Sequence, residues 1–179
     1  MSKKVLVITT SLRERSNSDA LADAFAAGAR AAGHQVEQIS LKGKQISFCR
    51  GCLACLHTQS CTIQDDAADL VARVGAADVV AFATPIYYYE MSGQLKTLLD
   101  RCNPLYDSDY AFREIYLLTT AADEGLQVPQ RAVTGLGGWI DCFPKASLAG
   151  TVFAGGINDP GSIEGHPALE EARQLGRSV

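Results

Sequence analysis

Short apolar runs alternate with helical patterns along the whole chain, and this alternation restricts the fold more than any other feature. Continuous β-favouring runs such as Val5-Leu6-Val7-Ile8 are typical of strands that are buried on both faces. A segment with apolar residues at helical spacing follows each run. The repeated order of strand and helix predicts a three-layer α/β/α protein, with a five-stranded parallel sheet between two layers of helices.

The runs also predict where the elements lie. We expect strands at residues 4–9, 35–40, 78–84, 114–120 and 147–153. We expect helices at residues 18–32, 92–102, 128–143 and 167–176, and one more that begins at Asp65 or Asp66. Residues 41–64 are expected to be irregular and residues 85–90 to form a loop. The missing side chain of Gly28 would let the first helix lie close to the sheet, and Cys102 and Cys142 are expected in the core.

The length of 179 residues fits one domain, residues 1–179, with a sizeable core. The net charge is −4 and no basic cluster exceeds the Lys3-Lys4 pair, which argues against a nucleic-acid partner. The apolar runs are too short for a membrane span or a signal peptide. We therefore expect a cytoplasmic protein with no membrane partner. In that compartment its six cysteines are expected to be thiols, metal ligands or redox groups.

The loop after the first strand carries many hydrogen-bond donors directly before a helix. Its candidate binding residues are Ser11, Arg13, Ser16, Asn17 and Ser18. Free N–H groups and the helix dipole favour an anion at such a place, and an arginine can bind a phosphate through two hydrogen bonds. The alternative is a capped helix after a polar loop, since Ser and Asn are common N-caps. The glycine fingerprints of dinucleotide and nucleoside triphosphate sites are both absent.

Two more loops are expected at the same edge of the sheet, beyond the carboxyl ends of the strands. The candidate residues of the second loop are Thr84, Pro85, Ile86, Tyr87, Tyr88, Tyr89 and Ser92. Three consecutive tyrosines cannot all face a core, so at least one is expected to project into the cleft or toward a partner. The alternative is a turn whose tyrosines pack on the next helix or on a dimer face. The third loop is small and polar, with Thr120 and Ala121 as candidates. We expect its backbone N–H groups to approach the carbonyl edge of a planar ligand, and the alternative is a plain turn with Asp123 as a helix cap. Together the loops predict a site for a flat, singly phosphorylated cofactor.

Four cysteines, Cys49, Cys52, Cys55 and Cys61, form a C-x2-C-x2-C-x5-C run. Four thiols this close in sequence can bind one soft metal centre. The spacing differs from that of the bacterial ferredoxin run. His57 would be able to replace one thiol on zinc, although a solvated loop histidine is the alternative.

The first loop reads Ser11-x-Arg13-x-x-Ser16-Asn17-Ser18. The second motif reads Thr84-Pro85-Ile86-Tyr87 and then Ser92-Gly93-x-Leu95-Lys96-x-x-Leu99-Asp100-Arg101. From about residue 3 to residue 125 the chain resembles the NAD(P)H-dependent FMN reductases of the flavodoxin-like fold. The resemblance implies strand order 2-1-3-4-5, the FMN phosphate in the first loop, and the isoalloxazine ring against residues 85–89 and the third loop. Arg13 departs from the uncharged phosphate loop of true flavodoxins.

The resemblance also implies an activity. NAD(P)H would be the co-substrate, and the reduced flavin would pass electrons to a quinone, a free flavin, another small acceptor or a cluster. Because the ring carries the hydride chemistry, we assign no catalytic side chain. An electron carrier without turnover and a flavin-binding regulatory module are the alternatives, and steady-state NAD(P)H oxidation distinguishes the enzyme from both.

The cysteine run resembles the compact motif of the iron–sulfur flavoproteins, a branch of the same family. In that branch the motif precedes an Asp-Asp pair, as Asp65-Asp66 do here. The resemblance implies a [4Fe–4S] cluster on these cysteines, near the flavin of a neighbouring subunit, as in that branch. Redox-active or regulatory thiols, a zinc site and no bound group are the alternatives. The tyrosines at residues 87–89 and the aromatic residues of the segment 104–112 also predict a homodimer or a higher homo-oligomer, with the flavin near the interface.

Overall fold

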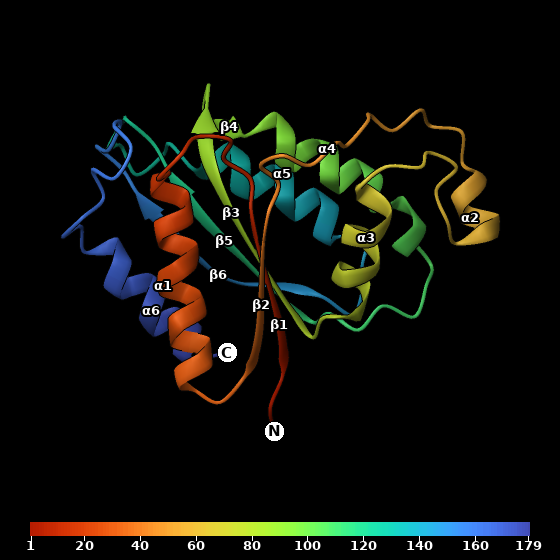
Figure 1. The fold of residues 1–179 in the computed structure, drawn as a ribbon, viewed down its shortest axis with the longest axis horizontal. Coiled ribbons are helices and arrows are strands. Elements are labelled where there is room, and N and C mark those ends of the chain that lie inside the picture. The colour runs from red at the N-terminus through yellow and green to blue at the C-terminus, as the bar shows by residue number, and fades with distance from the viewer.

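The computed structural model describes residues 1–179. Its strands form a central sheet, and its helices lie on either side of that sheet (Figure 1). The strands are β1 (Lys4–Thr9), β2 (Gln35–Ser40), β3 (Val79–Tyr87), β4 (Glu90–Met91), β5 (Glu114–Thr120) and β6 (Ser147–Ala154). The α-helices are α1 (Asn17–Ala31), α2 (Ala54–Thr58), α3 (Ala67–Ala76), α4 (Gly93–Arg101), α5 (Gln130–Ile140) and α6 (Ala168–Arg177). A short 3-10 helix (Asn103–Leu105) follows α4.

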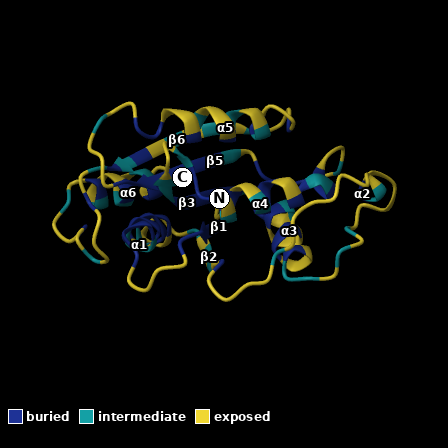
Figure 2. Ribbon diagram, turned by 90° about the horizontal axis from the view of Figure 1, so that it is seen from above, coloured by how far each residue is buried: buried dark blue, intermediate teal, exposed yellow.

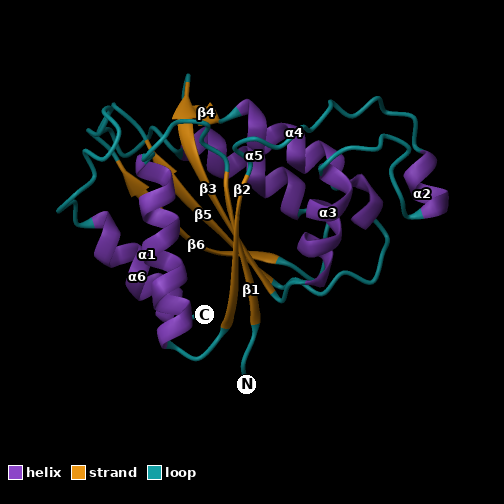
Figure 3. Cartoon of the chain, viewed as in Figure 1, coloured by secondary structure: helices purple, strands orange, loops and turns teal.

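The sheet has the strand order β2-β1-β3-β5-β6, and all of these neighbours are parallel (Figure 3). Numbered among themselves, the five parallel strands have the predicted flavodoxin order 2-1-3-4-5. The sequence did not predict β4, which pairs antiparallel with the end of β3. The expected loop at residues 85–90 is therefore wrong: β3 continues to Tyr87, and a tight turn leads straight into β4.

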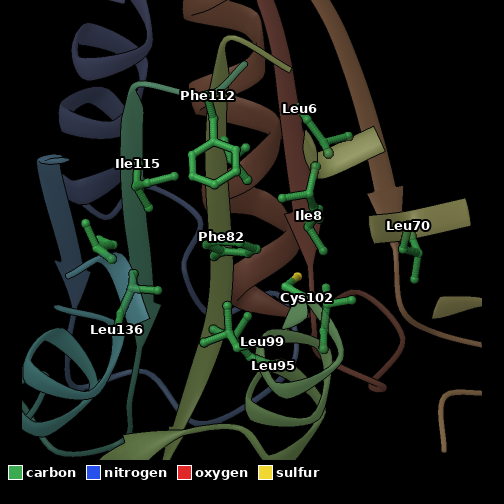
Figure 4. Close-up of a cluster of buried hydrophobic side chains, with 14 of the residues drawn as sticks. Leu6, Ile8, Leu70, Phe82, Leu95, Leu99, Cys102, Phe112, Ile115 and Leu136 are labelled. Atoms are coloured by element: carbon green, nitrogen blue, oxygen red, sulfur yellow. The ribbon is translucent and has the colours of Figure 1, made fainter. Parts of the chain in front are cut away.

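Helices cover both faces of the sheet and make two separate cores. On one face, α3, α4 and α5 pack over the side chains of the central strands (Figure 4). Phe82 of β3 lies in the middle of this cluster, with Leu95 and Leu99 of α4 and Leu136 of α5 around it. On the other face, α1 and α6 cover a second cluster that is rich in alanine and valine. This arrangement confirms the three-layer α/β/α architecture.

Burial along each strand follows its place in the sheet (Figure 2). The first six residues of β3 are all buried, because the strand is central and helices cover both of its faces. The edge strand β2 alternates between exposed and half-buried residues. The order of the sheet therefore places the carboxyl ends of β1, β3 and β5 next to one another at one edge.

Helices α1 and α6 touch through their backbones at two glycines. A Cβ atom at Gly28 would lie 2.0 Å from the carbonyl oxygen of Arg173, and one at Gly176 would lie 2.1 Å from that of Phe25. The missing side chain of Gly28 thus serves the contact with α6, and the expected close approach to the sheet is wrong. The contact matters for the site because α6 packs against the C-terminal half of α1 and so helps to hold that helix in place (Figure 1).

Three other expectations need correction. The irregular stretch at residues 41–64 contains the short helix α2. Helix α5 ends at Ile140 instead of Phe143, since the residue before Pro144 is disfavoured in a helix. Cys142 consequently lies beyond the helix and is exposed, whereas Cys102 is buried as expected. No helix combines the length and the apolar character that crossing a membrane requires.

Candidate functional site

The N-terminus of α1 presents unused hydrogen-bond donors at the carboxyl edge of the sheet. Ser16 caps the helix, and its Oγ accepts a hydrogen bond from the N–H of Asp19 at 3.1 Å. The N–H groups of Asn17 and Ser18 donate to no oxygen atom of the protein. These free donors and the helix dipole together favour an anion. The cap is Ser16 and not Ser18, which is buried beside it with 3.3 Å between the two hydroxyl oxygens.

Two of the predicted donors contact the loop that follows β6, residues 155–165. The Arg13 guanidinium donates to the carbonyl of Asn158 at 2.9 Å. The side-chain amide of Asn17 donates to the carbonyl of Asp159 at 2.9 Å and accepts from the N–H of Ile163 at 3.3 Å. Asn17 is therefore an anchor for this loop, while its backbone N–H remains free.

The hairpin between β3 and β4 turns through Tyr88 and Tyr89. Their φ angles are +52° and +64°, the pattern of a two-residue hairpin turn that normally uses Asn and Gly. Tyr88 is 98% exposed at the tip, and Tyr87 is 48% exposed. The Tyr89 hydroxyl donates to a carboxylate oxygen of Asp123 at 3.1 Å, which ties the hairpin to the third loop. The turn holds two aromatic side chains in a strained backbone, and such strain is common at ligand sites.

This strain leads to a testable expectation. Replacing Tyr88 with Asn should raise the stability of the ligand-free protein by about 0.5–1 kcal/mol, because Asn tolerates positive φ better than Tyr. The free energy of unfolding in urea measures the change. The matched control is Tyr106→Asn, since Tyr106 is also exposed but has φ −61°. An equal gain in both variants would contradict the strain.

The third loop is a turn and not a helix cap. A carboxylate oxygen of Asp123 accepts the N–H of Gly125 at 2.8 Å, two residues later. The N–H of Ala121 is already bonded to the carbonyl of Ala154, so it is not free for a ligand. The expected approach of backbone donors from this loop is therefore limited to the residues after Ala121.

These loops enclose a cavity of about 290 Å³. Its lining includes all but three of the predicted residues: Ser11, Arg13, Ser16, Asn17, Ser18, Pro85, Ile86, Tyr87, Tyr88, Thr120 and Ala121. Ala122, Ile157, Asn158 and Pro160 also line it and were not predicted. The lining contains one cationic side chain, that of Arg13, and no carboxylate. Its electrostatic character therefore suits an anion at the end of the cavity near α1.

The other three predicted residues lie outside the lining. Thr84 and Ser92 are fully buried, and the Thr84 hydroxyl accepts the N–H of Ser92 at 3.1 Å. Ser92 also caps α4 and lies 3.0 Å from the hydroxyl of Thr10, so it links the first and second loops. Tyr89 contacts the third loop through its hydrogen bond to Asp123. Thr84 and Ser92 thus support the loops of the cavity from the core.

The four cysteines of the run line a second cavity, of about 310 Å³. It lies at the end of the molecule that carries α2, well away from the N-terminus of α1 (Figure 1). Cys55 is buried, Cys61 is half-buried, and Cys49 and Cys52 are exposed. No three of these side chains are close enough together to hold a metal ion as they stand. The four cysteines therefore surround one cavity, but their sulfur atoms do not converge on one metal position.

Hydrogen bonds from the protein reach the sulfur atoms of this cavity. The N–H of Gly51 donates to Cys49 and that of Ile63 donates to Cys61, both at 3.5 Å. The backbone N–H of Ala54 and then the hydroxyl of Thr62 lower the pKa of Cys52. Such donors stabilise thiolates, which are the form that binds metals. His57 does not line the cavity.

Comparison with known proteins assigns the family. The sequence model of the NADPH-dependent FMN reductases matches residues 3–157, which include the first three loops of the α1 cavity. The chain belongs to the NADPH-dependent FMN reductase family. This reductase is accordingly an FMN-dependent oxidoreductase, as the sequence predicted.

Individual relatives refine the comparison. An iron-sulfur flavoprotein of Archaeoglobus fulgidus is 28% identical over 98% of this chain and 78% of its own length. An iron-sulfur flavoprotein of Methanosarcina thermophila is 24% identical over 94% of this chain and 85% of its own length. The NAD(P)H:quinone oxidoreductase from Methanothermobacter marburgensis has the same fold, with a TM-score of 0.80 and 21% identity over 99% of this chain and 96% of that one.

Proposed function

We propose that this reductase binds FMN in the α1 cavity, takes a hydride from NAD(P)H and reduces a quinone or another small acceptor. The observation that carries the site assignment is the pairing of free N–H groups at Asn17 and Ser18 with the Arg13 cation in a lining without carboxylates. A phosphate group satisfies all of these donors. The apolar side chains of Pro85 and Ile86 line the same cavity and fit a flat ring system.

Each part of the cavity has a distinct task in this proposal. The bound flavin supplies the hydride and electron chemistry itself. The first loop binds the phosphate and fixes its position, while Tyr87 and Tyr88 orient the ring and leave part of it open to solvent. The lining contains no carboxylate, histidine or lysine. In this proposal the chain contributes binding and orientation at this site.

The variant Arg13→Ala tests the phosphate assignment. Loss of a charge-assisted hydrogen bond of about 1.5–3 kcal/mol should weaken FMN binding roughly 10- to 150-fold, while the fold stays intact. Titration of FMN followed by its fluorescence gives the dissociation constant. Arg30→Ala is the matched control, because Arg30 is exposed at the other end of α1. Equal FMN affinity in the wild type and Arg13→Ala would contradict the assignment of the phosphate to this loop.

Turnover is measured as steady-state NAD(P)H oxidation with an added benzoquinone. Fast oxidation by either nicotinamide supports the reductase with a small acceptor. Slow reduction of the protein by both nicotinamides, together with fast reduction by ferredoxin, would indicate an electron carrier in place of the proposed reductase.

A [4Fe–4S] cluster is a second candidate function for the other cavity. The observation that favours it is that Cys49, Cys52, Cys55 and Cys61 all line one space and that backbone N–H groups already reach sulfur atoms there. The donor set fits a soft metal centre, although the thiols would have to converge. Iron analysis and an absorption spectrum of protein purified without oxygen test the candidate.

We also propose a homodimer and a cytoplasmic location. Tyr88 and Tyr106 are exposed aromatic residues that a partner subunit would cover. Tyr110 of the same region is buried, so it offers no contact surface. The exposed thiols of Cys49 and Cys52 persist most readily in a reducing compartment. Light scattering and cell fractionation test the two statements separately.

A further inference from the structure

The two ends of the cysteine segment, residues 41–64, meet in a narrow neck. The N–H of Gln45 donates to a carboxylate oxygen of Asp66 at 2.7 Å, and the N–H of Asp66 donates back to the carbonyl of Gln45 at 3.1 Å. The N–H of Ser47 donates to Asp65 at 2.8 Å. All four cysteines of the run lie between these closing contacts. The geometry of the neck therefore limits how the thiols are arranged.

Arg101, from the last turn of α4, lies inside this neck. Its guanidinium makes a two-point contact with Asp65, at 2.7 and 2.9 Å, and both side chains are almost completely buried. The same group donates to the carbonyl of Ser47 at 2.8 Å and to that of Ile63 at 3.3 Å. Arg101 thus contacts the two chain segments of the neck at once, Ser47 on one side and Ile63 and Asp65 on the other. A lysine would be unable to make this set of contacts, because it lacks the planar fork.

Arg101 also lies near one cysteine of the run, because Arg101 and Cys61 line one small cavity. The hydrogen bond to Asp65 raises the pKa of Arg101, against the effect of burial. The Arg101 Nε is buried and has no hydrogen-bond partner. Arg101 is therefore a buried cation with one unused donor, and it lines one small cavity together with Cys61.

Asn103 provides a second point of support at the start of the 3-10 helix. Its side-chain nitrogen donates to the sulfur of Cys55 at 3.0 Å. Cys55 is the buried cysteine of the run, and Asn103 lines the same cavity as the four thiols. The end of α4 therefore contacts the cysteine segment both at its neck and near its middle.

We propose that Arg101 and Asn103 are positioning residues that hold the four thiols around one cavity ready for a soft metal centre. Arg101 acts through Asp65 and the backbone of the neck, and Asn103 acts through Cys55. The inference deepens the second candidate function and rests on it. It assigns a role to two residues that touch neither the flavin cavity nor, directly, a metal.

The experiment uses the full-length chain and Co²⁺ as the probe, in the absence of oxygen. The thiolate-to-cobalt absorption band reports binding by cysteines, and hydrogen exchange of residues 48–62 reports closure of the neck in the metal-free protein. The test variants are Arg101→Lys, which retains the charge, and Asn103→Leu, which removes only the donor to Cys55. The control is Arg73→Lys, since Arg73 makes an exposed ion pair on α3 and does not contact the cysteine segment.

We expect each test variant to bind Co²⁺ roughly 10- to 100-fold more weakly than the wild type, the usual effect of losing a residue that supports a metal ligand. Arg101→Lys should also speed exchange across residues 48–62, and all variants should keep the wild-type FMN affinity. Wild-type binding and exchange in both test variants would overturn the inference alone. Absence of the thiolate band in the wild type would overturn the soft-metal candidate together with the inference, but would leave FMN binding untouched.

Discussion

Replacing Gly28 with alanine should cost this protein about 3 kcal/mol of stability, although alanine is the better helix former. In an open helical position, the exchange of glycine for alanine stabilises by up to about 1 kcal/mol. Here the new Cβ would lie 2.0 Å from the carbonyl oxygen of Arg173 and 3.0 Å from the backbone nitrogen of Arg177. These atoms belong to the main chain of α6, so relief requires that α6 shift as a whole, and overpacking of this kind costs about 1–3 kcal/mol or more.

The matched control reverses the sign. Gly138 of α5 is exposed, and an added Cβ there would meet no atom within 4 Å. Gly138→Ala should therefore stabilise the protein slightly, by less than about 1 kcal/mol. Urea unfolding of the two variants measures both effects. A stabilised Gly28→Ala variant would show that α1 and α6 are not in backbone contact. FMN affinity should also fall in Gly28→Ala, because α6 supports the helix whose N-terminus faces the cavity.

The strands were predictable because their signal is local. The apolar run at residues 4–9 and the β-favouring run at residues 114–120 give β1 and β5 with the expected bounds. The hairpin at Tyr88 was not predictable, because a turn with two positive φ angles is normally recognised in a sequence by an Asn-Gly pair, which is absent here. Cys142 was misplaced because the end of α5 depends on Pro144 and not on the apolar spacing that suggested a longer helix.

In the candidate site, too, features with a local sequence signal were predicted and features that depend on long-range contacts were not. The loops after β1, β3 and β5 were identified because parallel strands bring their carboxyl ends together, and each loop carries distinctive residues. The contribution of Asn158 was missed, because the loop after β6 reaches the cavity through long-range contacts with Arg13 and Asn17. The glycine-rich sequence of that loop, which follows a strand at the same edge, was the available signal. The supporting role of Ser92 likewise depends on contacts between separate loops.

The isosteric variant Asp65→Asn should lose about 3–5 kcal/mol at neutral pH. It leaves the Arg101 guanidinium, only 1% exposed, without its anionic partner, and breaking a buried ion pair in this way costs that much. It also loosens the neck of the cysteine segment, since Asp65 accepts the N–H of Ser47. The comparison variant is Asp69→Asn, which breaks an exposed pair with Arg73 and should change stability little.

Acid titration separates this ion pair from a mere loss of packing. Arg101 is the main cause that lowers the pKa of Asp65 from 3.8 to about 2. A carboxyl whose pKa is lower in the folded protein stabilises the fold above its unfolded value, and this contribution disappears as the pH falls through the folded value. The wild type should therefore lose up to about 2 kcal/mol between pH 4 and pH 2 from this group, and Asp65→Asn should lack that part of the acid dependence. The stability gap between the two proteins should narrow over this range, as measured by urea unfolding at each pH. A gap that stays constant from pH 7 to pH 2 would mean that the charge of Asp65 contributes no stability.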